Sequence, residues 1–174
     1  VGAENVFDYS LGNPSIPSPD GVNRAIIETI ENESPLAVHG YTSAPGYDGV
    51  RSAVAKDLTD RFGMEIKANN LFFTCGAAPA LCAVLKALST DNSEVIAIAP
   101  FFPEYRPFIE YSGSKFVMVP PDTDSFQINF DALRGLINEH TQAVIINSPN
   151  NPSGVVYTAE TIEKLGALLE SRSA

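Results

Sequence analysis

The segment NSPNNPSG, residues 147–154, follows a run of β-branched residues and combines asparagines with prolines. Pro149 and Pro152 fix the backbone angle φ and remove two backbone donors. Asn151 is then held between restricted neighbours, from where its amide could donate a hydrogen bond to a ligand oxygen. A proline-rich turn in which asparagine has its usual turn role explains the same residues.

The segment TCGAAPAL, residues 74–81, runs through a glycine into a helical pattern. The first amides of such a helix, around Gly76, Ala77 and Ala78, have no acceptor within the helix, and a phosphate is their natural ligand. A tight turn with small residues for packing is the alternative interpretation. The sequence has no GxGxxG and no Walker lysine in this segment, which disfavours a dinucleotide or a nucleoside triphosphate.

The segment APFFPEY, residues 99–105, places two phenylalanines between prolines. Phe102 is the better candidate for stacking on a flat conjugated ring, where an offset stack adds roughly 0.5–1.5 kcal/mol beyond burial. Phe101 is expected in the core. The alternative is that both rings belong to the core.

Alternating strands and helices are predicted around these segments. Apolar runs without period-2 alternation indicate strands covered on both faces. They occupy residues 71–74, 95–99, 116–119 and 143–147. Helical patterns cover residues 50–62 with Gly63 as C-cap, 78–88 as a buried helix, 131–137, and a last helix capped by Thr158 with Ile162, Leu165 and Leu169 inward. This order predicts an α/β fold, a mostly parallel sheet with helices on both faces.

In open sheets of this kind, ligands bind beyond the carboxyl ends of the strands. The three segments each follow a predicted strand, so we expect them to meet at one edge. The turn-rich residues 1–45 are predicted to form an N-terminal arm and part of a smaller domain, and residues 46–174 the first part of the main domain. The start at Val1 and the final helix without a following strand predict a portion of a longer protein.

The composition excludes several classes of function. The net charge of -10 argues against nucleic acid or an anionic membrane as a partner, and no apolar run approaches the ~20 residues that span a bilayer. Cys75 and Cys82 predict no disulfide framework and favour a reduced, cytoplasmic protein. His39 and His140 are far apart, so no metal site is expected. Cys75 could be an acidic thiol at a helix start, but we interpret it as a small packed residue.

Five segments in order resemble the class I/II aminotransferases, which are pyridoxal-phosphate enzymes of fold type I, and the aspartate-aminotransferase-like branch most. They are SLGNP (10–14), YTSAPGYDGVRSAVA (41–55), TCGAAPAL (74–81), PFFPEY (100–105) and SPNNPSG (148–154). The last segment is usually NNPTG in that family. The resemblance implies the large domain of a pyridoxal-phosphate transferase fold and a homodimer.

The resemblance also implies roles for single residues. Asn151 matches the residue that hydrogen-bonds the phenolic oxygen of the cofactor, and Phe102 matches the ring stacked on it. Ala77 and Ala78 match the positions whose helix-start amides hold the phosphate, without the hydroxyl that the family often has there. Two matches lie earlier in the chain: Tyr41 with the tyrosine that reaches the partner's phosphate, and Gly12 with the glycine near the substrate carboxylate. Arg51 is expected to be structural.

The resemblance implies that the Schiff-base lysine, the carboxylate on the pyridinium nitrogen and the arginine for the substrate carboxylate lie downstream. Lys115 opens a predicted strand, and the other four lysines are expected at the surface. The predicted function is amino transfer between an amino acid and a 2-oxo acid by the longer protein, with this segment inactive alone. A C–S lyase or decarboxylase on the same scaffold, or a non-catalytic fragment that binds the cofactor or another anion, are the alternatives.

Overall fold

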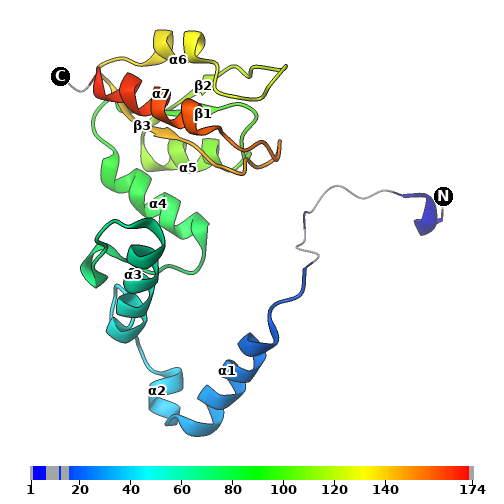
Figure 1. Cartoon of the computed structure of the whole chain (residues 1–174), viewed down its shortest axis with the longest axis vertical. Helices are drawn as coiled ribbons and strands as arrows, with labels where there is room; N and C mark the ends of the chain where they lie inside the picture. The colour runs from blue at the N-terminus through cyan, green and yellow to red at the C-terminus, as the bar shows by residue number, and fades with distance from the viewer. Residues whose placement is uncertain (1, 7–11, 13–15, 173–174) are drawn as a thin grey trace. The chain divides into compact units, whose positions relative to one another are not determined.

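A computed structural model describes residues 2–6, 12 and 16–172 of the chain (Figure 1). The chain forms two compact units, residues 1–72 and 73–174. Among the described residues, no helix is long and apolar enough to cross a membrane. The domain division predicted at residue 45 concerns the longer protein and stays a prediction.

The first unit consists of helices. They are the short 3-10 helices η1 (Ala3–Asn5) and η2 (Ala68–Asn70) and the α-helices α1 (Asp20–Asn32), α2 (Pro35–His39) and α3 (Asp48–Phe62). Helix α2 starts where the Ser34 side chain accepts a hydrogen bond from the Ala37 amide at 3.2 Å. Helix α3 ends at Gly63, whose φ of 67° is the left-handed conformation that glycine adopts without strain, as the sequence predicts.

Arg51 ties α3 to η2 within this unit. Its side chain is buried and pairs with Asp48, while Nη1 donates to the Ala68 carbonyl at 3.2 Å. These contacts give Arg51 the structural role that its place near the helix start suggests.

The second unit is an α/β layer structure. Its strands are β1 (Glu94–Ile98), β2 (Lys115–Val119) and β3 (Thr141–Ile145), and its helices are α4 (Ala77–Leu88), α5 (Tyr105–Ser112), α6 (Phe130–Leu136) and α7 (Ala159–Glu170). The strands form a parallel sheet in the order β2-β1-β3. This confirms the predicted fold class.

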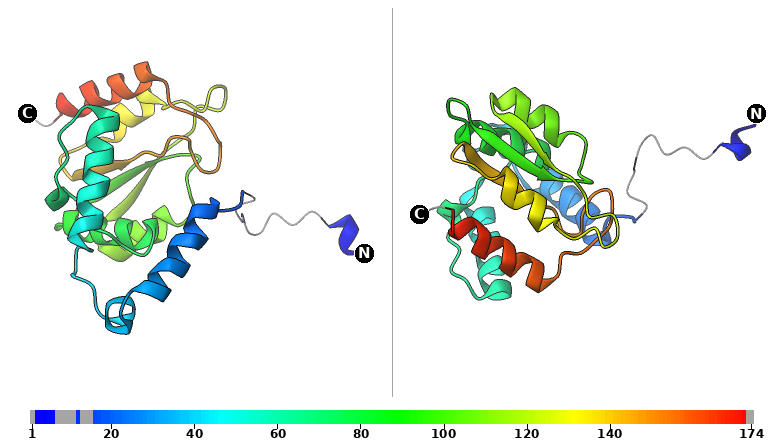
Figure 2. Two further views of the ribbon diagram at one scale, coloured as in Figure 1. Left: turned by 60° about the horizontal axis from the view of Figure 1, so that its bottom comes forward. Right: turned by 90° about the horizontal axis from the view of Figure 1, so that it is seen from above.

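Helices cover both faces of the sheet (Figure 2). Alternate residues of β1 enter two separate clusters because successive side chains of a strand point to opposite faces. Ile96 and Ile98 pack with residues of α6 and α7, whereas Val95 packs with Leu85 of α4 and Ile109 of α5. All five residues of β1 are buried, which explains why its sequence shows no polar alternation.

The ends of the helices follow local capping chemistry. The Thr158 hydroxyl accepts from the Thr161 amide at 3.1 Å and starts α7, which confirms its predicted cap. The buried face of α7 consists of Thr161, Leu165 and Leu168, with Leu169 packed beside it. Ile162, predicted to face inward, is 40% exposed. Thr161 takes the inward position predicted for Ile162, and its hydroxyl donates to Gln127 Oε1 at 2.8 Å.

Two predicted elements differ in the structure. Residues 71–74 are not a strand: Leu71 is extended, but no strand of the described residues pairs with this segment, and Phe72 remains 66% exposed. A strand requires a hydrogen-bonded neighbour, which the apolar run alone does not supply. Helix α4 exists as predicted, but Leu85 is its one buried residue among those described, and it packs with Val95 of β1 and Ile109 of α5.

Candidate functional site

The segments that follow β1 and β3 lie side by side at the carboxyl edge of the sheet. The two strands pair in parallel, with Ala97 opposite Ile145 at the end of the ladder. Past that point, Asn150 Nδ2 donates to the Pro100 carbonyl at 2.9 Å and links the two segments. The structure therefore brings APFFPEY and NSPNNPSG together, as their positions after neighbouring strands predict.

The loop after β3 is held by its own polar groups. Asn147 Oδ1 accepts a hydrogen bond from the backbone amide of Asn151 at 2.8 Å, and Ser148 Oγ accepts one from the backbone amide of Tyr157 at 3.0 Å. Asn150 donates to Ser153 Oγ at 2.8 Å, and its carbonyl accepts from the Gly154 amide at 2.7 Å. The prolines alone do not fix the loop; side-chain oxygens satisfy the backbone amides that remain.

Asn151 stands out in this loop because its side chain is exposed and has no hydrogen-bond partner among the described residues. Its backbone amide is the only group of the residue in a described bond. The side-chain amide is therefore available to a ligand oxygen. Its role in binding a cofactor stays a prediction.

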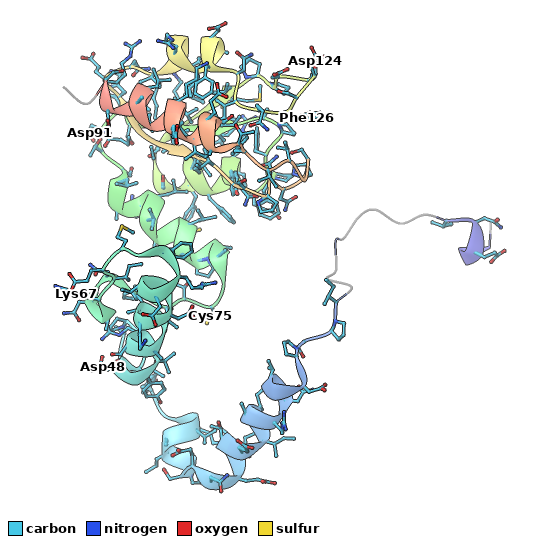
Figure 3. The ribbon with its side chains drawn as sticks, in the orientation of Figure 1. Asp48, Lys67, Cys75, Asp91, Asp124 and Phe126 are labelled. Atoms are coloured by element: carbon cyan, nitrogen blue, oxygen red, sulfur yellow. The ribbon has the colours of Figure 1, made fainter. Side chains whose placement is uncertain are left out.

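Helix α4 begins at Ala77, two residues after Cys75, which Figure 3 labels. Gly76 has φ 96° and ψ -179°, a region that is essentially restricted to glycine, and a Cβ there would meet nothing within 4 Å. The Gly76 amide donates to the Thr74 carbonyl at 2.8 Å, so it is not free as the sequence suggested. The Ala77 and Ala78 amides have no acceptor among the described residues, which leaves two donors for an anion.

The C-terminal ends of α4 and α5 lie together. Lys86 Nζ, near the end of α4, donates to the carbonyl of Ser112, the last residue of α5, at 3.0 Å, and the two helices pack against each other. Because α5 begins just after Phe102, we expect the start of α4 on the side of the sheet that carries Phe102 and Asn151, and this stays a prediction.

The two phenylalanines after β1 differ in their surroundings. The Phe101 ring packs against Phe116 with centroids 5.2 Å apart and so contacts the core, as expected. The half-buried Phe102 ring meets Tyr105 edge-on, with centroids 5.7 Å apart. One aromatic neighbour covers at most one face of the Phe102 ring, which is compatible with a ligand stacked on the other face.

Two tyrosines near this edge keep their protons to higher pH than a solvated phenol. Burial raises the pKa of Tyr105. Burial, followed by the charge of Tyr105, raises the pKa of Tyr157. Both hydroxyls therefore stay neutral around pH 7, and the edge carries no tyrosinate charge.

The remaining predicted site residues belong to the first unit. Tyr41 is fully exposed. Gly12 is exposed with open space around it, but residues 7–11 and 13–15 on either side of it lie outside the described residues. The roles of both residues stay predictions.

Lysines and other reactive groups lie elsewhere. Lys115 opens β2, as predicted, and pairs with Glu94 at 2.6 Å; Lys86 is bonded to Ser112, and Lys164 lies over the Phe130 ring at 4.3 Å. Lys56 and Lys67 pair with acidic neighbours in the first unit. Both cysteines are free, and Cys75 is exposed rather than packed. The described residues contain no group of three or more His, Cys, Asp or Glu that could hold a metal ion.

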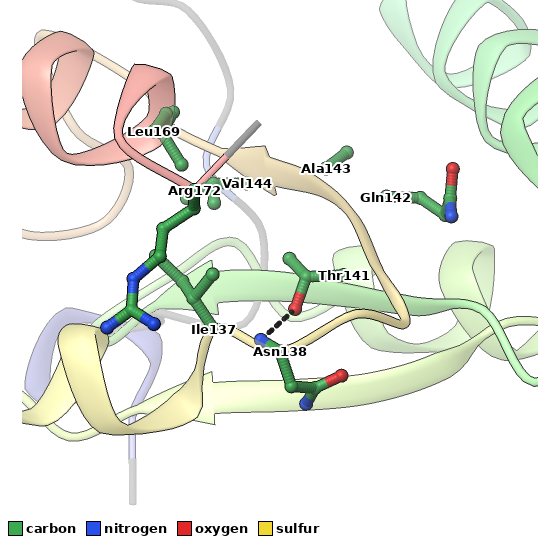
Figure 4. A pocket seen from close by; sticks show the side chains of 8 residues that line it. All are labelled: Ile137, Asn138, Thr141, Gln142, Ala143, Val144, Leu169 and Arg172. Carbon is green, nitrogen blue, oxygen red and sulfur yellow. Dashed lines mark hydrogen bonds between the residues drawn. The ribbon is translucent and has the colours of Figure 1, made fainter. Parts of the chain in front are cut away.

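A hollow of about 220 Å³ lies near the amino end of β3, beside the C-terminal end of α7 (Figure 4). Two of the polar groups that line it form a hydrogen bond with each other: the backbone amide of Asn138 donates to Thr141 Oγ1 at 3.1 Å. This hollow lies beside the opposite end of β3 from the ligand-binding edge expected of an open parallel sheet.

Asn150 is the residue that sequence reasoning missed. Only 7% of it is exposed, and both of its amide donors are used within the protein. The doubled asparagine was the available signal, because two adjacent side chains on a tight loop face different ways. The sequence could not tell which of the two faces the ligand and which the protein.

The parallel sheet with helices on both faces defines an α/β protein of the open-sheet class, in which ligands bind beyond the carboxyl ends of the strands. The family model "Aminotransferase class I and II" matches residues 4–174. The chain belongs to this family, whose members are pyridoxal-5′-phosphate-dependent enzymes with the large domain of this fold.

Relatives of known structure confirm the match. An amino transferase from Eubacterium rectale is 52% identical with a TM-score of 0.95, over 98% of this chain and 43% of that chain. The aspartate aminotransferase of Thermotoga maritima is 32% identical, over 98% of this chain and 44% of the relative, and its structure has a TM-score of 0.85. A probable N-succinyldiaminopimelate aminotransferase of Mycobacterium tuberculosis is 32% identical, over 95% of this chain and 42% of the relative. The chain thus spans about two fifths of the relatives it matches.

The residues present fit the cofactor of the family. The Gly76 turn, with two free backbone amides after it, suits a phosphate, and the Phe102 ring suits a flat heterocycle. The side-chain amide of Asn151, which has no partner among the described residues, suits a phenolic oxygen. The fit rests on groups whose hydrogen-bonding or stacking capacity is unused within the described residues.

Proposed function

We propose that the longer protein containing this chain is a pyridoxal-phosphate-dependent aminotransferase that exchanges an amino group between an amino acid and a 2-oxo acid. This chain supplies the part of the site that binds the cofactor. One observation carries the proposal: the Asn151 side chain, on the loop linked to the Phe102 segment, and the Ala77 and Ala78 amides at the start of α4 have no hydrogen-bond partner among the described residues.

Each residue has a distinct role in this proposal. The Ala77 and Ala78 amides, at the positive end of the α4 dipole, hold the phosphate. Phe102 supports one face of the ring, and Asn151 donates to its phenolic oxygen and so orients it. When bound, the cofactor supplies an electron-withdrawing ring that stabilises negative charge on the α-carbon of the amino acid. The reactive lysine comes from the part of the protein beyond this chain.

The substrates and the assembly are part of the same proposal. We propose a homodimer in which the exposed Tyr41 of one subunit reaches the phosphate in the partner's site. Gly12, with open space around it, allows the substrate carboxylate to approach the backbone. The residues 1–45 form an arm and part of a small domain, and 46–174 the first part of the large domain. The two free cysteines favour a cytoplasmic enzyme of amino acid metabolism.

Two alternatives use the same residues. A C–S lyase or decarboxylase needs the same cofactor cradle, because reaction choice depends on groups that contact the substrate. A fragment that binds the cofactor without catalysis would need only the cradle. We favour aminotransferase because the relatives reported above carry that name.

The test uses the full-length protein with added pyridoxal phosphate. L-Aspartate and other amino acids are offered with a 2-oxo acid, and the new amino acid is measured. Transfer of the amino group at a rate far above that without protein supports the proposal. Release of ammonia with pyruvate from a cysteine conjugate, or of CO2, without transfer would establish an alternative reaction. A protein that binds no pyridoxal phosphate would contradict the cofactor assignment itself.

A further inference from the structure

Asn150 is a buried amide between the two segments that carry Phe102 and Asn151. We propose that Asn150 is a positioning residue that sets the place of the Asn151 amide relative to the Phe102 ring. The inference rests on the proposed function, and it assigns a role that lies beyond the residues in contact with the cofactor.

The contacts of Asn150 reach both segments. One donor of its Nδ2 group goes to the carbonyl of Pro100, two residues before Phe102, at 2.9 Å. The same group donates to Ser153 Oγ at 2.8 Å, inside the turn that presents Asn151. Both donors of the amide are therefore used, and 7% exposure keeps water from competing for them.

No other hydrogen bond among the described residues joins these two segments past the end of the β1–β3 ladder. The ladder ends at Ala97 and Ile145. The Ala99 amide turns away to the Val119 carbonyl of β2, at 3.0 Å. A ligand that touches both Phe102 and Asn151 needs each of them held to within about 0.5 Å of its binding position. The Asn150 amide is the described group that supplies this link.

Ser153 supplies the second acceptor of the Asn150 side chain. Its hydroxyl accepts from Asn150 and, at 3.3 Å, from the Val155 amide. Both contacts use the hydroxyl, so a methyl group beside it, as in threonine, should be tolerated. Removal of the hydroxyl leaves one buried donor of Asn150 without an acceptor, which costs about 1–3 kcal/mol in general.

The experiment compares matched variants of the full-length protein. Asn150→Asp keeps the shape but replaces both donors by an acceptor next to the Pro100 carbonyl. Asn147→Asp adds the same charge to the same loop, but Asn147 uses only its Oδ1 acceptor, which aspartate keeps. Ser153→Ala removes the hydroxyl, and Ser153→Thr retains it.

The measured quantities are the dissociation constant of pyridoxal phosphate from absorbance titration, the absorbance band of the bound cofactor, and the thermal midpoint of the cofactor-free protein. We expect Asn150→Asp and Ser153→Ala to weaken binding about tenfold and shift the band. Asn147→Asp and Ser153→Thr should stay within about twofold of the wild type, which is less than the effect of one lost buried hydrogen bond.

A second measurement separates positioning from general stability. If Asn150 acts through Asn151, then Asn150→Asp should add little to the effect of Asn151→Ala, because coupled residues are not additive. A lower thermal midpoint with unchanged affinity and band in Asn150→Asp and Ser153→Ala would overturn the inference. So would full additivity with Asn151→Ala. If the wild type itself binds no cofactor, the proposed function has failed instead.

Discussion

The two edges of the sheet treat polar groups in opposite ways. At the amino edge, Glu94 accepts from Lys115 at 2.6 Å and from Asn138 at 2.8 Å, which ties the starts of β1 and β2 to the turn before β3. Ser93 and Ser114 bond each other nearby at 2.8 Å. At the carboxyl edge, the Asn151 side chain has no partner among the described residues, and neither do the amides of Ala77 and Ala78 at the start of α4.

This difference separates structure from function within one unit. Polar groups that serve the fold are paired with each other, because an unpaired buried group is costly. Groups that serve a ligand keep unused capacity and stay exposed. The comparison favours the proposed carboxyl edge as the ligand side without reference to any cavity. Substitutions at the carboxyl edge should affect cofactor binding, and substitutions at the amino edge should affect stability.

The largest effect on binding is expected for Asn151→Ala in the full-length protein. Loss of a hydrogen bond to a charged phenolic oxygen costs about 1.5–3 kcal/mol, or roughly 10- to 100-fold in affinity for pyridoxal phosphate. The side chain makes no bond inside the chain, so the thermal midpoint without cofactor should not change. Absorbance titration and a thermal scan measure both. A large loss of stability with unchanged affinity would contradict this assignment.

Gly76→Ala should have the second-largest effect on cofactor affinity. Its φ of 96° with ψ -179° disfavours any side chain, and strain of this kind costs about 1–3 kcal/mol. No atom blocks the added Cβ, so the helix start relaxes and moves the Ala77 and Ala78 amides away from the phosphate. Affinity for pyridoxal phosphate should fall about tenfold, while pyridoxal without phosphate should bind with little change. Equal losses for both molecules would argue against a phosphate cradle.

Phe102→Leu should have a smaller effect. Stacking contributes roughly 0.5–1.5 kcal/mol beyond burial, which corresponds to about a 2- to 12-fold weaker affinity. Phe101→Leu is the matched control, since its ring packs on Phe116 in the core and should affect stability instead. If Phe101→Leu weakened cofactor binding more than Phe102→Leu, the assignment of the two rings would be reversed.

Glu94→Gln should leave cofactor affinity unchanged and affect only stability. Hydrogen bonds from Lys115 and then Asn138 hold the pKa of the Glu94 carboxyl below its usual range. The stabilisation is complete above the pKa of an unfolded glutamate, about 4.3, and it is lost as the pH falls through the lower folded pKa. The thermal midpoint of the variant should be lower than that of the wild type at pH 7, and the difference should shrink in acid. A difference that grows in acid would contradict this account.

Much of the fold could be predicted from local patterns. The apolar runs predicted β1, β2 and β3, and β1, which is buried at all five positions, shows why such a strand has no polar alternation. Thr158 and Gly63 marked helix ends through their own chemistry. Residues 71–74 show the limit: an apolar run specifies burial, but pairing depends on a neighbour that local sequence does not contain.

The candidate site was partly predictable for the same reason. Gly76 and the small residues after it predicted a helix start with free amides, although the Gly76 amide itself bonds to Thr74. The choice between Asn150 and Asn151 depended on which amide the Pro100 carbonyl accepts from, a contact between residues 50 positions apart. Such a contact is set by the packing of two strands and has no signature in either segment.

The most direct test of the central claim is an experimental structure of the full-length protein with pyridoxal phosphate. The account predicts the phosphate on the Ala77 and Ala78 amides, the ring stacked on Phe102, and the phenolic oxygen within hydrogen-bond distance of Asn151 Nδ2. A cofactor bound away from the carboxyl edge of the sheet, or an Asn151 side chain that faces away from the ring, would contradict it.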